Sequence, residues 1–181
     1  MYYKLLFKIK SSLHNCYSLL IKTNFQVQGG SIGKKVILFP FKATWPHKIS
    51  IGDNCFIERN VFFKYDGIFS AGKSIIINNN TFIGNNSEFN IAKSIHIGKD
   101  VLIASGCKFI DHDHGFKISE LIRIQKPLNA AIFIDDGVWI GCNAVILKGV
   151  TIGKGAIVAA GAVVNKSIPA FEIWGDRKSV V

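Results

Sequence analysis

Branched aliphatic residues recur along the C-terminal part of the chain with a period of six. They occupy every sixth position from Ile134 to Val164, and small or β-branched residues stand two positions before the last five of them. The column is Ile134, Ile140, Ile146, Ile152, Val158 and Val164. This period fits neither an α-helix, which repeats every 3.6 residues, nor a simple alternating strand. It predicts short strands that turn a corner after every six residues, with three strands completing one triangular coil.

The same columns occur upstream in shorter runs that each end in phenylalanine. The runs are Ile51/Ile57/Phe63, Ile77/Ile83/Phe89 and Ile97/Ile103/Phe109. Glycine, Asn and Asp cluster beside the aliphatic residues, which is typical of turns in which positive φ is easily reached. A single coil cannot enclose its own apolar side chains, but a stack of coils can. The pattern therefore predicts an all-β fold, a parallel β-helix solenoid.

Two interruptions of the period predict loops. After Phe109 the next inward position falls at residue 115, yet the phase resumes only at Ile134, so residues 115–133 are expected to protrude. A smaller insertion lies near residues 66–76. Insertions into a solenoid emerge on one face and often build the binding site.

The N-terminal segment has a helical period instead. Apolar residues recur at spacings of three and four, with lysines on the opposite face, which predicts an amphipathic helix over residues 3–22. Such a helix either covers the open end of the solenoid or packs on a neighbouring subunit, and the alternative is contact with a membrane surface. The chain thus divides into a helix and lead-in (1–29), a β-helix domain (30–175) and a short tail (176–181).

Charge and composition narrow the classes of function. The 181 residues carry 22 Lys plus Arg against 12 Asp plus Glu, and residues 1–52 contain eight lysines and no acid. A basic N-terminal end suits a membrane surface or a polyanion, but no nucleic-acid-binding motif accompanies it, so no nucleic-acid partner is expected. The 49% hydrophobic content excludes a disordered chain. Four cysteines without CxxC spacing, and no signal-peptide or membrane-spanning run, favour a cytoplasmic protein, with the inner face of the membrane as an alternative location.

The segment Asp-His-Asp-His-Gly at the edge of the long loop carries the clearest chemistry. It places His112 and His114 beside Asp111 and Asp113. An imidazole accepts a proton near neutral pH, and a neighbouring carboxylate can fix its tautomer. A metal site and a purely structural loop anchor are the alternatives, but no third His or Cys column supports a metal, so none is expected.

On these repeats and this motif, the chain resembles the left-handed β-helix, or hexapeptide-repeat, acyltransferases over about residues 30 to 175. The likeness is closest to the sugar O-acetyltransferases of surface polysaccharide pathways, of the colanic-acid and maltose acetyltransferase type. The resemblance implies acetyl-CoA as donor and a homotrimer with active sites between solenoids. It also implies a histidine at the loop base that deprotonates the acceptor. The end of the motif matches that position at His114, and a shift of two residues would select His112, with Asp111 or Asp113 orienting the base.

The C-terminal coils resemble the coenzyme A surface of that family. The implied cofactor-binding residues are Trp139, Gly141, Asn143, Ala159, Ala160, Gly161, Lys166, Arg177 and Lys178. Lys148 and Lys154 are further candidates for the phosphates, and subunit packing is the alternative role for Trp139. The tail departs from the family pattern, because a proline is missing after Gly175 and the following lysine is displaced by one position.

The expected function is transfer of an acetyl group from acetyl-CoA to a hydroxyl of a sugar or polysaccharide precursor. An amino group on a nucleotide-linked sugar is the alternative acceptor, because the motif does not distinguish oxygen from nitrogen. A non-catalytic or metal-binding β-helix is the third hypothesis.

Overall fold

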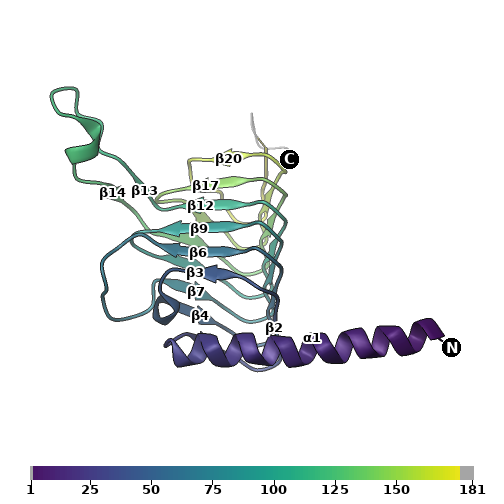
Figure 1. The fold of residues 1–181 in the computed structure, drawn as a ribbon. Coiled ribbons are helices and arrows are strands. Elements are labelled where there is room, and N and C mark those ends of the chain that lie inside the picture. The colour runs from purple at the N-terminus through teal and green to yellow at the C-terminus, as the bar shows by residue number, and fades with distance from the viewer. Residues whose placement is uncertain (1, 176–181) are drawn as a thin grey trace.

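A computed structural model of the chain describes residues 2–175, without the side chains of Tyr2, Leu5 and residues 7–16. A long helix, α1 (Tyr2–Val27), precedes a stack of coils built from three parallel sheets (Figure 1). Every strand of a coil pairs in parallel with its equivalents in the coils before and after it. The fold is the predicted left-handed parallel β-helix.

We name the three sheets A, B and C. Sheet A contains β1 (Ser31–Ile32), β4 (Ile49–Ile51), β7 (Ile75–Ile77), β10 (Ile95–Ile97), β15 (Ile132–Ile134) and β18 (Thr151–Ile152). Sheet B contains β2 (Ile37–Leu38), β5 (Phe56–Ile57), β8 (Phe82–Ile83), β11 (Leu102–Ile103), β16 (Trp139–Ile140), β19 (Ile157–Val158) and β21 (Ile173–Trp174). Sheet C contains β3 (Lys42–Ala43), β6 (Phe62–Tyr65), β9 (Glu88–Ile91), β12 (Lys108–Ile110), β17 (Val145–Leu147) and β20 (Val163–Val164).

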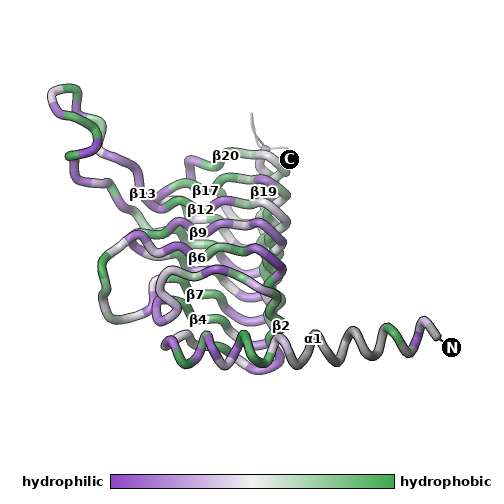
Figure 2. Tube along the Cα trace, viewed as in Figure 1, coloured by the Kyte–Doolittle hydropathy of each residue, from purple (hydrophilic) through white to green (hydrophobic). Residues whose placement is uncertain are grey.

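The predicted columns form the core. The aliphatic residue that ends each hexad is buried inside the triangle, and the strand register stacks it on its equivalent in the next coil. In sheet C the column is aromatic from β6 to β12, with ring centroids 5.0 Å apart between Phe63 and Phe89 and 4.6 Å apart between Phe89 and Phe109. Figure 2 shows the resulting alternation of apolar and polar positions along every coil. Cys55 and Cys107 also lie in this core, as small buried residues.

Asn and Gly recur at the corners of the coils because the backbone turns there with positive φ. Asn54, Asn80 and Asn143 adopt φ angles of 56°, 59° and 57°, a left-handed conformation that Asn tolerates better than most residues. Their side chains also connect successive coils, because Asn54 donates to the Asn80 Oδ1 at 3.2 Å and Asn80 donates to the Asp100 Oδ1 at 2.8 Å.

Helix α1 covers the first coil with its C-terminal half, and its N-terminal half projects past the solenoid (Figure 1). Ser18 and Phe25 are buried, Ile21 packs against the core, and the Leu38 amide donates to the Ser18 hydroxyl at 3.4 Å. The helix runs five residues beyond the predicted end at residue 22, because Phe25 adds another contact with the first coil. Among the described residues, no helix has a segment apolar enough to cross a bilayer.

The three edges of the prism differ in regularity. We call the corners between sheets B and C the B–C edge, which comprises residues 39–41, 58–61, 84–87, 104–107, 141–144 and 159–162. We call the corners between sheets C and A the C–A edge, which comprises residues 44–48, 66–74, 92–94, 111–131, 148–150 and 165–167. Corners on the B–C edge have nearly constant length, whereas both insertions leave the solenoid at the C–A edge (Figure 1).

The long insertion forms an arm. Its base is an antiparallel pair, β13 (His112–Asp113) and β14 (Leu128–Asn129), and a short 3₁₀ helix, η2 (Ile122–Ile124), lies near its tip. The arm returns to the solenoid at Ile132, two residues earlier than the phase count predicts, because β15 begins two residues before its final inward position, Ile134.

Candidate active site

Asp111 is the anchor of the site. Its side chain is fully buried, and its two oxygens accept the backbone N–H groups of Ala92 and Lys93, each at 2.7 Å. Both donors belong to the corner of the coil below, so the carboxylate satisfies polar groups that would otherwise be buried without partners. Asp111 thereby fixes where the arm leaves the C–A edge.

His112 lies between two carboxylates. Its Nδ1 is 3.1 Å from the Asp111 Oδ1, and its Nε2 is 3.7 Å from the Asp66 Oδ2. The Lys64 ammonium lies 3.5 Å from the same Asp66 oxygen. Asp66 was not predicted from the sequence, although it stands directly at the smaller break in the period. Its approach to His112 depends on strand register across sheet C, which brings together residues far apart in the chain.

Asp113 points to a different partner. Its Oδ2 is 2.6 Å from the Lys148 Nζ, so an ion pair joins the base of the arm to the next coil. Lys148, a candidate for the coenzyme phosphates, thus lies against this carboxylate in the single chain.

His114 follows β13 at the base of the arm, and its side chain is exposed. Within residues 2–175 no side chain makes a hydrogen bond or ion pair with it, so the orientation of this imidazole by Asp111 or Asp113 stays a prediction. In the single chain both carboxylates have other partners: Asp111 accepts from two backbone amides of the corner below, and Asp113 faces Lys148.

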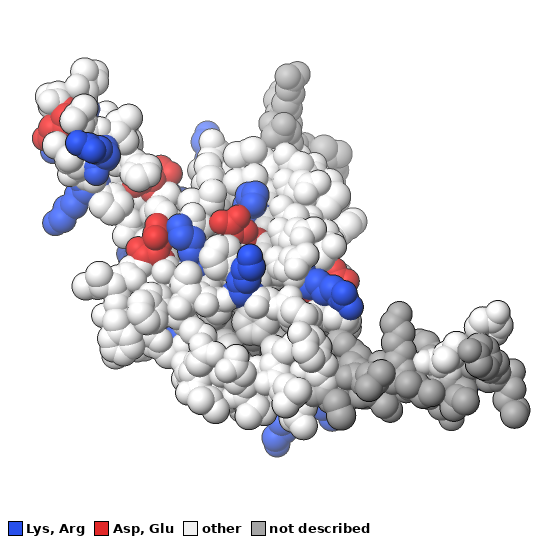
Figure 3. Space-filling view, in the orientation of Figure 1, with Lys and Arg blue, Asp and Glu red and all other residues white. Residues whose placement is uncertain are grey.

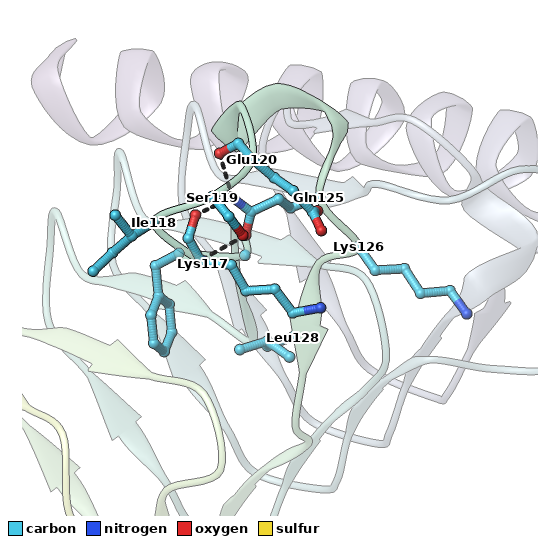
Figure 4. Close-up of a pocket in the computed structure, with 9 residues that line it drawn as sticks. Lys117, Ile118, Ser119, Glu120, Gln125, Lys126 and Leu128 are labelled. Carbon is cyan, nitrogen blue, oxygen red and sulfur yellow. Dashed lines mark hydrogen bonds between the residues drawn. The ribbon is translucent and has the colours of Figure 1, made fainter.

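Gln125 organises the arm beyond this point. Its side chain accepts the Lys117 N–H at 2.8 Å and donates to the carbonyl oxygens of Lys117 and Glu120 at 2.9 and 2.8 Å (Figure 4). A cavity of about 790 Å³ lies against this segment and is lined mainly by apolar groups. Phe116 and Ile118 contribute to its wall and remain largely exposed. The arm therefore presents an apolar surface that its own chain does not cover.

Most of the predicted coenzyme residues gather at the B–C edge. Gly141, Asn143, Ala159, Ala160 and Gly161 occupy two stacked corners, and the Gly161 N–H donates to the Cys142 carbonyl at 2.8 Å. A Cβ on Gly161 would meet no atom within 4 Å, so the backbone is open to a ligand there. Trp139 lies on the outer side of sheet B, two residues before this edge, and is half-exposed.

The remaining predicted coenzyme residues lie elsewhere. Lys166 is on the C–A edge, whereas Arg177 and Lys178 fall outside the described residues. The two edges bound sheet C, and the five steps of extended chain from Asn143 to Lys148 correspond to about 16 Å. Within one chain, the predicted coenzyme residues of the B–C edge and the histidines of the C–A edge therefore lie on opposite sides of sheet C.

The buried cysteines are unsuited to nucleophilic chemistry. Burial raises the pKa of the Cys107 thiol to about 11, and the thiol donates to the Gly141 carbonyl at 3.2 Å. Burial also raises the pKa of Cys55. Since the thiolate is the reactive form, these residues serve packing, as predicted from their position in the repeat.

On the face shown in Figure 3, charged side chains of the two signs are interleaved. Figure 3 shows positive and negative side chains side by side on the solenoid face, and the Lys108 Nζ lies 2.9 Å from the Glu88 Oε2. Among the residues that the structure describes, no three His, Cys, Asp or Glu side chains are grouped to hold a metal ion.

Two family models match the coils that surround this site. The bacterial transferase hexapeptide (six repeats) model matches residues 131–166, and the hexapeptide repeat of succinyl-transferase model matches residues 74–107. The chain carries hexapeptide repeats of the bacterial transferase type and is an acyltransferase. No curated protein sequence matches it significantly.

Solved structures share the fold of this acyltransferase over most of their length. A hexapeptide-repeat acetyltransferase from Vibrio cholerae complexed with acetyl coenzyme A is 26% identical, with a TM-score of 0.61, covering 87% of this chain and 73% of that one. AntD, an N-acyltransferase from Bacillus cereus in complex with dTDP and 3-hydroxybutyryl-CoA, is 20% identical, with a TM-score of 0.72, covering 87% of this chain and 85% of that one. A mutant form of AntD, in complex with dTDP-4-amino-4,6-dideoxyglucose and coenzyme A, is also 20% identical, with a TM-score of 0.73 and the same coverage.

Proposed function

We propose that this acyltransferase moves an acetyl group from acetyl-CoA to a hydroxyl of a sugar or polysaccharide precursor, with His114 as the general base. The observation that carries the proposal is the exposed imidazole at the base of the arm, beside a segment fixed by the buried Asp111. The ring of His112 is already placed between the carboxylates of Asp111 and Asp66, so we assign it a positioning role.

The reaction requires one proton acceptor and no covalent enzyme intermediate. His114 takes the proton of the acceptor hydroxyl while the oxygen attacks the thioester carbonyl, and a C–O bond forms. The tetrahedral intermediate then expels the coenzyme A thiolate, which takes the proton from the imidazolium. The products are the acetyl ester and free coenzyme A, and the base is regenerated.

The donor is proposed to lie along the B–C edge. Backbone groups at Gly141 and Gly161 and the ring of Trp139 would contact its pantetheine arm, since small residues at 159–161 permit close approach. Lys166 and the tail residues Arg177 and Lys178 are the proposed partners of its phosphates.

We further propose a homotrimer in which the B–C edge of one copy faces the C–A edge of the next. The distance of about 16 Å across sheet C keeps the two halves of the site apart within one chain. The apolar side chains of the arm, Phe116 and Ile118 among them, are exposed and would be covered by the adjacent copy.

A second acceptor class is the amino group of a nucleotide-linked sugar. The observation in its favour is the fold shared with AntD, one of whose structures holds dTDP-4-amino-4,6-dideoxyglucose. Mass-spectrometric localisation of the transferred acetyl group on oxygen or nitrogen distinguishes the two acceptors.

The proposed location is the cytoplasm, with α1 able to touch the inner face of the membrane. The N-terminal half of the helix projects past the solenoid, and Leu6 is exposed there (Figure 1). Cosedimentation of the intact protein with anionic and neutral vesicles tests this contact, and equal partition with both would contradict it.

The decisive test of the catalytic assignment compares two conservative variants. His114→Asn is expected to lower kcat by about 100-fold or more at unchanged KM for acetyl-CoA. His112→Asn should lower kcat less and reduce the melting temperature. Retained turnover in His114→Asn together with loss in His112→Asn would transfer the role of base to the Asp111–His112 pair.

A further inference from the structure

We propose that three aromatic side chains on the C–A edge, Trp45, His47 and Phe69, form a platform that binds a distal sugar of an extended glycan acceptor. The inference rests on the proposed function and names the acceptor class of the same site. It concerns a surface on which no residue was predicted to act.

The platform is a built cluster of rings. The centroids of His47 and Phe69 are 4.8 Å apart, and that of Trp45 lies 5.7 Å from His47 and 5.9 Å from Phe69. The Trp45 Nε1 donates to the Gly67 carbonyl at 3.2 Å, and the His47 Nε2 lies 3.1 Å from the Ser70 carbonyl oxygen. These polar ring atoms thus hold the loop 66–74, while Phe69 keeps 69% of its surface exposed.

Exposed aromatic rings held in fixed orientation provide a large apolar contact area at little cost in conformational entropy. The apolar face of a pyranose ring packs well on such a surface. The neighbouring Ile68 is 88% exposed and widens the apolar area.

Contacts lead from the platform to the catalytic segment. Gly67, whose carbonyl accepts from Trp45, directly follows Asp66, and Asp66 reaches to within 3.7 Å of His112. Corner 44–48, loop 66–74 and the arm all emerge on the same side of the solenoid (Figure 1). Trp45 lies three coils below His114, which corresponds to about 14 Å at the usual strand spacing. That separation exceeds one monosaccharide, so an acceptor that reaches both positions is an oligosaccharide.

The charges around the platform favour an uncharged, hydroxyl-rich ligand. Lys48 donates to the Ala71 carbonyl at 3.1 Å, Lys73 donates to the Gly29 and Ile49 carbonyls, and Lys64 pairs with Asp66. Each of these three ammonium groups thus already has at least one partner, and the carboxylate of Asp66 keeps lone pairs that can accept hydrogen bonds from sugar hydroxyls. A diphosphate-linked nucleotide would have to rely on the exposed Lys93, one coil farther on.

Acceptor length provides the test. Acetyl transfer is measured for wild type and Phe69→Leu with a monosaccharide glycoside and with a tetrasaccharide of the same repeating sugar, chosen from the acceptors that wild type uses. The variant should show a KM about tenfold higher for the tetrasaccharide and an unchanged KM for the monosaccharide, because only the longer acceptor reaches the platform. Phe171→Ala, which removes an equally exposed ring elsewhere, should change neither.

Three outcomes overturn the inference. Equal KM values for the tetrasaccharide in wild type and Phe69→Leu remove the platform from acceptor binding, and a parallel rise for both acceptors indicates a general structural effect. If wild type preferred a UDP- or dTDP-sugar over the glycans and Lys93→Ala lost this preference, the surface would bind a nucleotide. Absence of transfer to every acceptor, with loss of acetyl-CoA binding, would instead contradict the proposed function itself.

Discussion

The B–C and C–A edges of the solenoid border the same sheet but differ in the length and residue content of their corners. Corners on the B–C edge keep nearly the same length from coil to coil and place Asn or Gly at positive φ, as at Asn60, Asn86, Asn143 and Gly161. Corners on the C–A edge range from three residues to the long arm, and they carry the imidazoles, the carboxylates and the aromatic platform.

The two edges are therefore suited to different functions. A regular edge gives a continuous backbone surface suited to a long coenzyme, whereas an irregular edge lets side chains from distant parts of the chain meet. The stacked core carries the stability that permits the irregular edge, so changes in the core should be costly and changes in the arm cheap.

The largest effect is expected from the aromatic column. Phe89→Ala removes a ring that stacks on Phe63 and Phe109 at the centre of the solenoid, and should lower the free energy of unfolding by about 3–5 kcal/mol. Phe116→Ala, on the arm, should change the unfolding free energy of the single chain by no more than about 0.5 kcal/mol, because within one chain this side chain is exposed. Urea denaturation of both variants measures the contrast, and equal losses would mean that the arm shares in the fold's stability.

The second largest loss of unfolding free energy is expected at Asp111, the residue that fixes the arm at the C–A edge. Asp111→Asn replaces an acceptor oxygen by an amide that faces a backbone N–H, and should cost about 2–3 kcal/mol in unfolding free energy. Asp113→Asn breaks only a partly exposed ion pair with Lys148 and should cost less than about 1 kcal/mol. Thermal or urea unfolding would refute the assignment of Asp111 as anchor if the two variants lost the same amount.

The regular edge can be tested with glycine. A Cβ on Gly141 would lie 2.5 Å from the backbone nitrogen of Ala160, so Gly141→Ala must shift two corners and should cost about 1–3 kcal/mol. In Gly161→Ala the Cβ has open space around it, so only the strain of a φ of 72° should lower the free energy of unfolding, by about 1 kcal/mol. A greater loss in Gly161→Ala would contradict the corner geometry.

The smallest effect concerns pH. Burial raises the pKa of Cys107 from its ordinary value of 9.0 to about 11, so the folded state keeps a proton that the unfolded state loses. The contribution of the protonated Cys107 thiol to the free energy of unfolding is fully present below pH 9 and is lost as the pH rises toward 11. Between about pH 8 and pH 10, wild type should lose about 1 kcal/mol more than Cys107→Ala. Parallel pH profiles of the two proteins would contradict this origin.

The regular edge follows from sequence because it depends on local chemistry. The period of six determines where each strand ends, and Asn or Gly marks every corner of this edge after the first. The same count locates both insertions, and it errs by two residues at Ile132 because it registers only the last inward position of a strand.

The irregular edge is harder to predict because its contacts depend on stacking. Sequence places His112, His114, Asp111 and Asp113 together, but not which carboxylate faces which partner. Asp66 and Lys148 approach this segment only because strands of sheet C align successive coils. The platform has the same origin, since Trp45 and Phe69 belong to consecutive corners.

The central claim, that one copy supplies the base and its neighbour the donor edge, is tested most directly by mixing two inactive variants. His114→Asn removes the base, and Gly161→Trp fills the open corner proposed for the coenzyme. Co-assembled in equal amounts, the two should regain about a quarter of wild-type acetyl transfer, because a quarter of the sites then combine an intact base with an intact donor edge from the adjacent copy. No recovery from co-assembled variants would show that both halves of the site belong to one chain.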